Sequence, residues 1–473
     1  MKIKDYFVKH KVFLSFIILI FFFSLVMLKF CISDNDYFWH IKAGKYMIDN
    51  NTILNTDIFS WSCYSKYWMS HEWLFEVLIY KLSLITNKHV LVYCFITTFS
   101  LLLMLFLNNK ENYLKNIPFT MIWIVIFFFF GGIISPRPQM LSYLFLAFTI
   151  YSLYDLWKNP NSRKIYFLPI VTILWANIHG GSSNLSYLFC LIFMICGLFK
   201  FKFSKIEATR LSKKQILKYG TVFILCILAI MINPHGIKML LYPYQNMADN
   251  LMLSNIAEWQ SSSLNTWSHY PYFIICLLIF FIMLFSKKKI QLIDFILFLV
   301  ALFLGLKSIR FWIYIYIIAT YFIFNYISDR KYDKGSSLVL IIFSLLLCLA
   351  FFLDYKVILS NTNQKLVSDN IISVIKRKSP KRLYNNYDYG GYLIYKDISV
   401  FVDGRCDLYS KYNYSDYISI SNLGKNYRKL IDKYKFDYFL VDSKFSIYYY
   451  LKDNDDYKLL VSDNGLYLFK KVN

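Results

Sequence analysis

The chain has 473 residues, of which 57% are hydrophobic, 20% aromatic and 17% charged, and its formal net charge is +23. Soluble globular proteins carry a smaller apolar share, so the composition indicates a polytopic α-helical membrane protein. A strongly basic chain can bind nucleic acid, but much of this charge lies in loops between apolar stretches. Membrane orientation explains it better, so the lipid bilayer is the expected partner and nucleic acid is not.

Apolar stretches of about 17 or more residues are long enough to cross a bilayer as helices. The first stretch lacks a small-residue cleavage site and is followed by others, which predicts a retained signal anchor. A shorter and more charged stretch, 72–85, is expected to form an interfacial helix. About eleven transmembrane helices are predicted, at 12–32, 89–107, 117–134, 138–157, 164–179, 183–199, 216–232, 270–285, 291–306, 310–327 and 336–353.

Lysine and arginine divide unevenly between alternate loops. By the positive-inside bias, the loops richer in these residues face the cytoplasm. The protein is therefore expected to be a multi-pass plasma-membrane protein with a cytoplasmic N-terminus and an extracytoplasmic C-terminal segment. The basic loops are the N-terminal tail, 108–116, 158–164, 200–218, 287–289 and 328–337.

The loops on the opposite side carry the unusual residues. Polar groups beside a membrane are costly unless paired or hydrated, so a cluster drawn from several loops suggests a shared aqueous pocket. Ordinary solvated loops with helix caps are the alternative. The outer loops are 33–73, 131–139, 177–184, 233–260 and 307–310.

Three acids of the first outer loop are the catalytic candidates. Asp34 and Asp36 lie in "DNDYFWH", and Glu72 lies in "MSHEW". A carboxylate at the membrane edge can accept a proton from a substrate hydroxyl. Alternatively, the aspartates cap a helix that begins near Tyr37, which explains one of them better than both.

Basic, acidic and histidine side chains of the outer side are the candidates for substrate or phosphate binding. Arg137 lies between two prolines in "SPRPQ", and its guanidinium can hold a phosphate or extend to lipid headgroups. Lys307 and Arg310 allow the same two interpretations. His179 and His235 each precede a glycine, where the chain can turn tightly, and either can be purely structural. The full predicted set is His40, Arg137, His179, His235, Glu258, Lys307, Arg310 and Arg405.

After about residue 354 the composition becomes polar and rich in tyrosine, which divides the chain into a membrane domain, 1–353, and a small extracytoplasmic α/β domain, 354–473. Helices are predicted near 368–378 and 422–434. Arg405, between Asp403 and Asp407, is the best candidate there for recognition of an anionic or sugar group, although Asp and Gly also form turns. Strands are predicted in "RLYNNY", "GYLIY", "SVFVDG", "FDYFLVD", "YKLLVSD" and "LYLFKK".

Motif spacing argues against several kinds of site. The nine cysteines lie mostly inside spans without paired spacing, which predicts neither a disulfide framework nor a zinc site. No phosphate-binding loop, dinucleotide fingerprint or metal-ligand spacing is present, so neither a soluble nucleotide donor nor a cofactor is expected.

Outer carboxylates with arginines from later loops suit transfer of a sugar from a polyprenyl-phosphate donor to a glycan, lipid or protein acceptor outside the membrane. An aspartate would take the acceptor's proton, and arginine or lysine would stabilise the departing phosphate. A polymerase or ligase of lipid-linked glycans would use a similar pocket. A transporter or a non-catalytic glycan-binding protein is the other alternative, but transporters place charge near the bilayer midplane, where these spans have almost none.

The sequence resembles the GT-C superfamily of polytopic glycosyltransferases, and most closely a bacterial branch of it. Protein O-mannosyltransferases, aminoarabinose transferases of lipid A and oligosaccharyltransferases belong to the same superfamily. The motifs that carry the resemblance extend over most of the chain. They are "DNDYFWHIKAGKYMIDNN", "NTDIFSWSCYSKYWMSHEWLFEVLIY", "SPRPQMLSYLF", "LWANIHGG", "NPHGIKMLLYPY…EWQSSS", "NNYDYGGYLIY" and "FVDGRCDLY".

The resemblance implies a catalytic aspartate in the first outer loop, which corresponds here to Asp34 or Asp36, and a second acid, which corresponds to Glu72. The spacing "DND" also resembles the acidic pair that binds a divalent metal in oligosaccharyltransferases. The mannosyltransferase-like members work without metal, and no metal is expected here. The two acids are not adjacent, unlike in the mannosyltransferases, so the choice between Asp34 and Asp36 stays open.

Overall fold

A computed structural model describes residues 3–31, 34–130, 134–326, 342, 346, 349 and 366–472. Contacts divide the chain into two compact units, each assembled from several segments. The helical unit comprises Met1–Ile32, Val90–Pro243 and Ile256–Thr362, and the mixed unit comprises Ser33–His89, Tyr244–Asn255 and Asn363–Asn473. The predicted span 336–353 lies almost entirely outside the described residues.

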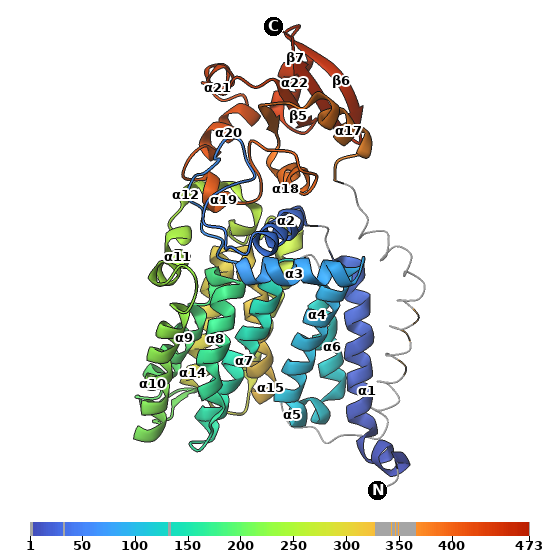
Figure 1. Cartoon of the computed structure of the whole chain (residues 1–473). Coiled ribbons are helices and arrows are strands. Elements are labelled where there is room, and N and C mark those ends of the chain that lie inside the picture. Colours follow the sequence, from blue (N-terminus) through green and yellow to red (C-terminus); the bar gives the residue numbers. More distant parts are fainter. Residues whose placement is uncertain are drawn as a thin grey trace. The chain divides into compact units, whose positions relative to one another are not determined.

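Long apolar helices make up the helical unit (Figure 1). They are α1 (Ile3–Met27), α4 (His89–Asn108), α6 (Ile117–Phe128), α7 (Gln139–Lys158), α8 (Leu168–Ile178), α9 (Leu185–Cys196), α10 (Lys213–Ile230), α13 (Tyr270–Phe285), α14 (Leu292–Lys307) and α15 (Trp312–Tyr326). Their positions agree with the predicted spans up to 310–327. Among the described residues, five helical stretches are long and apolar enough to cross a membrane, which supports a polytopic membrane protein without fixing the number of spans.

Aromatic and polar contacts hold α15 in the interior of this unit. Trp123 of α6 stacks on Tyr316 of α15 with ring centroids 4.6 Å apart, and its indole N–H donates to the Thr320 hydroxyl at 3.0 Å. Near the other end of α15, Tyr326 donates to the buried carboxylate of Asp294 in α14 at 2.5 Å. A buried carboxylate needs such donors to offset its lost hydration.

A four-stranded sheet forms the centre of the mixed unit. Its order is β4-β5-β7-β6, where β4 (Leu383–Asn385) pairs in parallel with β5 (Tyr438–Asp442), and β7 (Leu466–Lys471) pairs antiparallel with both β5 and β6 (Tyr457–Asp463). The unit's helices are α2 (Asp36–Asp49), α3 (Trp73–Ile85), α12 (Asn250–Asn255), α17 (Asp369–Lys378), α18 (Tyr387–Tyr395), α19 (Cys406–Tyr409), α20 (Tyr414–Ser421), α21 (Tyr427–Tyr434) and α22 (Ser446–Lys452).

Two of the predicted strands are wrong. "GYLIY" belongs to helix α18, and "SVFVDG" contains only an isolated bridge from Val400 to Ser60. Close packing against α18 explains the difference: a Cβ atom at Gly390 would lie 2.2 Å from the Val402 carbonyl oxygen, and one at Gly391 would lie 2.4 Å from the Asn35 carbonyl oxygen. Tertiary contact therefore overrides the β propensity of the aromatic residues in this motif.

The compact units differ from the division at residue 353 predicted from composition, because residues 33–89 group with the C-terminal segment. Hydrogen bonds show why. The Trp61 indole N–H donates to the Leu383 carbonyl at 3.0 Å, and the Ser62 hydroxyl donates to the Phe401 carbonyl at 2.5 Å. The stretch 72–85 is helical, as predicted, and forms α3; its location at a membrane interface stays a prediction.

Candidate functional site

Four predicted binding residues come together in the helical unit, although each lies in a different loop or helix end. We call Arg137, His179, Glu258 and Arg310 the arginine cluster. One Glu258 carboxylate oxygen, Oε1, lies 2.5 Å from Arg137 Nη1, and the other, Oε2, lies 3.7 Å from Arg310 Nη1. A single carboxylate thus contacts both guanidinium groups.

Backbone contacts fix the two segments that carry Glu258 and Arg310. The Ser308 hydroxyl donates to the Glu258 carbonyl at 2.8 Å, and the Ile309 N–H donates to the Gln260 carbonyl at 3.1 Å. The Arg310 guanidinium also lies over the Trp259 ring, 5.0 Å from its centroid. These contacts place Arg310 beside Glu258 and hold it there.

His179 orients Arg310 from the other side. Arg310 Nη2 lies 3.3 Å from His179 Nε2, and since a guanidinium can only donate, Nε2 accepts. The proton of a neutral imidazole then lies on Nδ1, which is 2.6 Å from the Ser142 hydroxyl. That hydroxyl also accepts from the Trp175 indole N–H at 2.9 Å. Because His179 is only 3% exposed, it is a positioning residue in this geometry.

The charged members of the cluster remain accessible to a ligand. The side chains of Arg137, Arg310 and Glu258 are 22%, 23% and 34% exposed, respectively. Partly buried arginines bind phosphate well because fewer water molecules must be displaced and the planar fork donates two parallel hydrogen bonds. The arrangement can therefore bind an anion.

Two other predicted binding residues, Lys307 and His235, also lie in the helical unit. Lys307 ends α14 with an exposed side chain. His235 occupies a turn in which its backbone N–H donates to Asn233 Oδ1 at 2.6 Å, and Gly236 adopts the left-handed conformation with φ +54°. The turn explains "NPHG", and a binding role for either residue stays a prediction.

A second group of titratable residues lies in the mixed unit. We call His40, His71, Glu72, Glu76 and Asp407 the histidine–carboxylate cluster. His40 lies between two acids, with Nε2 3.7 Å from Glu72 Oε2 and Nδ1 3.5 Å from Glu76 Oε1. His71 lies between Glu72 at 3.4 Å and Asp407 at 4.0 Å. The predicted residues His40 and Glu72 are thus neighbours.

The electrostatics of this cluster favour a charged His71. Burial lowers the pKa of the imidazole, but the Glu72 carboxylate beside it, with Asp407 and Glu76, outweighs burial and raises the pKa above its ordinary value. An imidazolium at this position balances part of the negative charge of the surrounding acids.

Asp34 and Asp36 also lie in the mixed unit, at the start of α2. Asp34 Oδ1 accepts the backbone N–H of Asp36 at 2.9 Å, a local turn contact just before α2, whose N-cap residue is Asn35. The Asp36 carboxylate lies against Gly404: a Cβ atom there would be 1.5 Å from Oδ1. Burial raises the pKa of the nearby Cys406 thiol, and the charges of Asp407, Asp249 and Asp36 raise it further.

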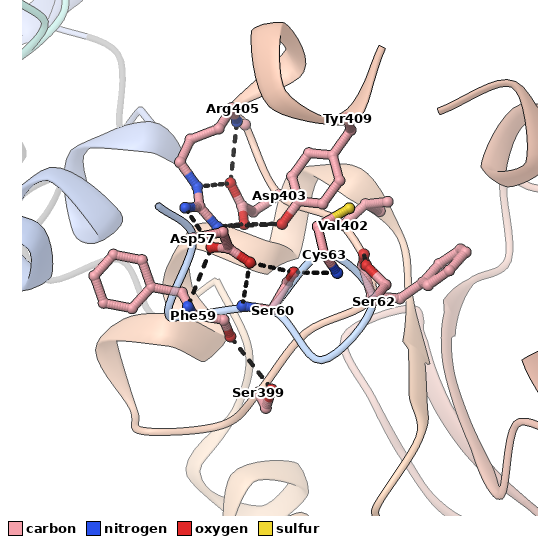
Figure 2. A network of polar contacts seen from close by, with 12 residues as sticks. Asp57, Phe59, Ser60, Ser62, Cys63, Ser399, Val402, Asp403, Arg405 and Tyr409 are labelled. Atoms are coloured by element: carbon pink, nitrogen blue, oxygen red, sulfur yellow. Dashed lines mark hydrogen bonds and ion pairs between the residues drawn. The ribbon is translucent and has the colours of Figure 1, made fainter. Parts of the chain in front are cut away.

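Arg405 lies in the interior of the mixed unit, where its guanidinium binds two aspartates (Figure 2). Nε and Nη2 donate to the two carboxylate oxygens of Asp403 at 2.8 and 2.6 Å, and Nη1 donates to Asp57 Oδ1 at 2.6 Å. Tyr409 also donates to Asp403, at 2.5 Å. With its side chain fully buried, Arg405 is an internal crosslink, not the recognition group for an anion or a sugar predicted from "DGRCD".

Two aromatic rings and a cysteine thiol lie in the buried surroundings of Arg405. Trp68 and Phe59 lie against the guanidinium, with ring centroids 4.8 and 5.2 Å from Cζ. Burial raises the pKa of the Cys63 thiol to about 11, the Ser62 hydrogen bond opposes this, and the Asp57 charge adds to it. Cys63 is therefore a neutral thiol at physiological pH.

Among the residues that the structure describes, no group of three or more His, Cys, Asp or Glu side chains is placed to hold a metal ion. The expectation of a metal-free protein, implied by the resemblance to the mannosyltransferase-like members, stays a prediction.

Comparison with solved structures identifies the fold. The chain is similar to an oligosaccharyltransferase of Archaeoglobus fulgidus with a tethered acceptor peptide, at a TM-score of 0.53 and 12% identity, over 93% of this chain and 70% of the other. The apo form of that protein gives 0.49 and 11%, over 90% and 69%. No family model and no curated protein matches the sequence. The chain therefore has a fold similar to that of this oligosaccharyltransferase.

Some members of the two clusters were not predicted, although the sequence carried a signal for several. Glu76 follows Glu72 by four residues, which places both on one face of a helix, and His71 directly precedes Glu72. The Ser142 and Trp175 contacts to His179 depend on packing between separate helices, for which the sequence offers no local signal.

Proposed function

We propose that the protein is a membrane glycosyltransferase of the GT-C type that transfers a sugar from a polyprenyl-phosphate donor to an acceptor outside the membrane. The observation that carries the proposal is the convergence of Arg137 and Arg310 on one carboxylate in a chain with a GT-C-like fold. Two guanidinium groups around an anion are suited to a phosphate that gains charge as the sugar departs.

In the proposed reaction, the bond between the sugar C1 and the phosphate oxygen breaks as a bond from C1 to the acceptor oxygen forms. Negative charge develops on the phosphate, where Arg137 and Arg310 stabilise it. The acceptor's proton passes to a carboxylate of the first outer loop. No soluble nucleotide is consumed.

We assign the base to Asp36 in preference to Asp34. Asp34 Oδ1 accepts the N–H of Asp36, so Asp34 has a local role at the start of α2. Glu72, which contacts both His40 and His71, is then an acid whose charge raises the pKa of His71. The sequence-based prediction allowed any of the three as the catalytic acid.

Purified protein in lipid nanodiscs, supplied with polyprenyl-phosphate sugars and a panel of glycan, lipid and peptide acceptors, tests the proposal. Asp36→Asn should lower the transfer rate by about 100-fold or more, since a general base contributes about 10²–10⁴-fold. Asp34→Asn should retain most of the rate. Equal turnover in wild type and both variants would remove the base assignment, and unchanged turnover in EDTA would support a metal-free reaction.

The lipid-linked glycan polymerase or ligase is the alternative enzyme class. It predicts donors that carry several sugars and products that grow by whole oligosaccharides. Mass spectrometry of the products from the same reactions separates these two outcomes, since a single-sugar transferase adds one unit to each acceptor.

A further inference from the structure

We propose that Glu258 is an internal counter-anion which holds the phosphate-binding position between Arg137 and Arg310 and is displaced when a phosphate binds. The inference rests on the phosphate-binding role proposed above for the arginine cluster, and it adds to that role the displacement of Glu258 by the phosphate. The ligand class is a phosphate monoester or diester, such as the headgroup of a lipid phosphate.

The geometry of Glu258 resembles that of a bound oxyanion. Its two oxygens are shared between two guanidinium groups, at 2.5 Å from Arg137 and 3.7 Å from Arg310. A phosphate offers the same pattern, because several of its oxygens can accept from separate donors. The carboxylate and the phosphate would therefore compete for the same N–H groups.

Charge balance makes the exchange feasible. Two arginines and one glutamate leave a net positive charge, which attracts a second anion to the cluster. When the carboxylate leaves, each guanidinium regains an anionic partner from the phosphate. Glu258 is 34% exposed, so water can solvate the released carboxylate and its displacement costs little.

The backbone around Glu258 is held in place. The Glu258 carbonyl accepts from Ser308, and the Gln260 carbonyl accepts from the Ile309 N–H. Rotation of the glutamate side chain therefore suffices to break its ion pairs with the arginines, without opening of the loop. The exchange should then be fast on the timescale of side-chain rotamer changes.

Binding of two probes to the full-length protein tests the proposal. Farnesyl phosphate supplies a lipid phosphate, and inorganic phosphate supplies the headgroup chemistry alone. The fluorescence of Trp259, which lies over the Arg310 guanidinium, can report binding, with a Trp259→Phe background identifying its signal. Glu207→Gln is the matched control because Glu207 makes an ion pair with Lys202 in a different part of the helical unit.

Glu258→Gln keeps the size of the side chain but removes its charge. It should tighten binding of farnesyl phosphate by about two-fold to five-fold, the range expected for loss of a partly exposed competing ion pair. Glu207→Gln should match the wild type. Equal tightening for inorganic phosphate would show that the headgroup suffices, whereas tightening for farnesyl phosphate alone would show that the lipid is also recognised; both support displacement.

Unchanged or weaker binding in Glu258→Gln, with a thermal unfolding midpoint like that of the wild type, would overturn the proposal and make Glu258 a fixed support of the arginines. Glu258→Ala provides the same comparison if the glutamine variant is unstable. Failure of sugar transfer, despite tighter probe binding in Glu258→Gln, would reject the proposed function alone. Binding of neither probe to any variant would reject both.

Discussion

Arg405 Nη1 lies 2.6 Å from Asp57 Oδ1, although the two residues are 348 positions apart in the sequence. This buried ion pair joins the segment Ser33–His89 to the C-terminal segment and explains why contacts place both in one unit. Buried ions are tolerated where every charge has partners, and Asp403 supplies the rest of them.

Arg405→Ala should destabilise the mixed unit by about 3–5 kcal/mol, because it leaves Asp57 and Asp403 as buried carboxylates without their cation. Thermal unfolding in detergent micelles, together with limited proteolysis of the C-terminal segment, measures the effect. Arg428→Ala changes an exposed arginine of the same unit and should have little effect. Equal stability of the Arg405 and Arg428 variants would refute the crosslink.

Gly404→Ala should lower the transfer rate by about ten-fold to 100-fold, because small displacements of a reacting group are costly. The added methyl would lie 1.5 Å from Asp36 Oδ1, so the carboxylate must move. Gly220→Ala is the control: its Cβ would meet only Met194 Sδ, at 3.5 Å. A Gly404→Ala enzyme that folds and transfers sugar at the wild-type rate would contradict the role of Asp36.

His71 should make the stability of the mixed unit depend on pH. Its pKa is raised in the folded state, so its contribution is complete below the ordinary value of 6.5 and is lost as pH rises through the higher folded value. The thermal unfolding midpoint should therefore fall as pH rises above about 6.5. His71→Gln should flatten that dependence, whereas His235→Gln should not. An identical pH profile in His71→Gln and wild type would count against the imidazolium.

Labelling of introduced cysteines tests the predicted orientation in the membrane. Asn161 lies in a predicted cytoplasmic loop. Ser268 lies between the predicted spans 216–232 and 270–285, on the predicted outer side, and both residues are exposed. The eight native cysteines that the structure describes are buried, so they should react slowly with a maleimide. An impermeant maleimide added to intact cells should label Ser268→Cys but not Asn161→Cys. The reverse pattern would invert the topology.

Sequence patterns predicted the helical unit well because each span is a local property: a long apolar stretch must be helical in lipid. The prediction of secondary structure was less successful where tertiary contacts determine whether a segment is a helix or a strand. "GYLIY" has strand-like composition, but Gly390 and Gly391 let a helix pack closely against neighbouring backbone. Nothing local to the sequence shows that approach.

For the candidate sites, too, the sequence indicated individual residues but not the tertiary contacts between them. Arg137, Glu258 and Arg310 were predicted as binding residues because charged side chains beside a membrane are costly unless they are paired or hydrated. Their mutual contacts, and the support of His179 by Ser142, emerge only when separate helices pack together. Arg405 was misjudged because a sequence shows its charge but not its burial, and Asp57, its distant partner, lies in another loop.

Sugar transfer by the arginine variants tests the proposed function most directly. Purified wild type, Arg137→Ala, Arg310→Ala and the double variant would be supplied with a radiolabelled polyprenyl-phosphate sugar, and folding would be checked by thermal unfolding. Each single substitution should reduce the transfer rate by about 100-fold, the typical loss when one stabilising donor is removed from a developing anion. A folded double variant that transfers sugar as fast as the wild type would contradict the phosphate site.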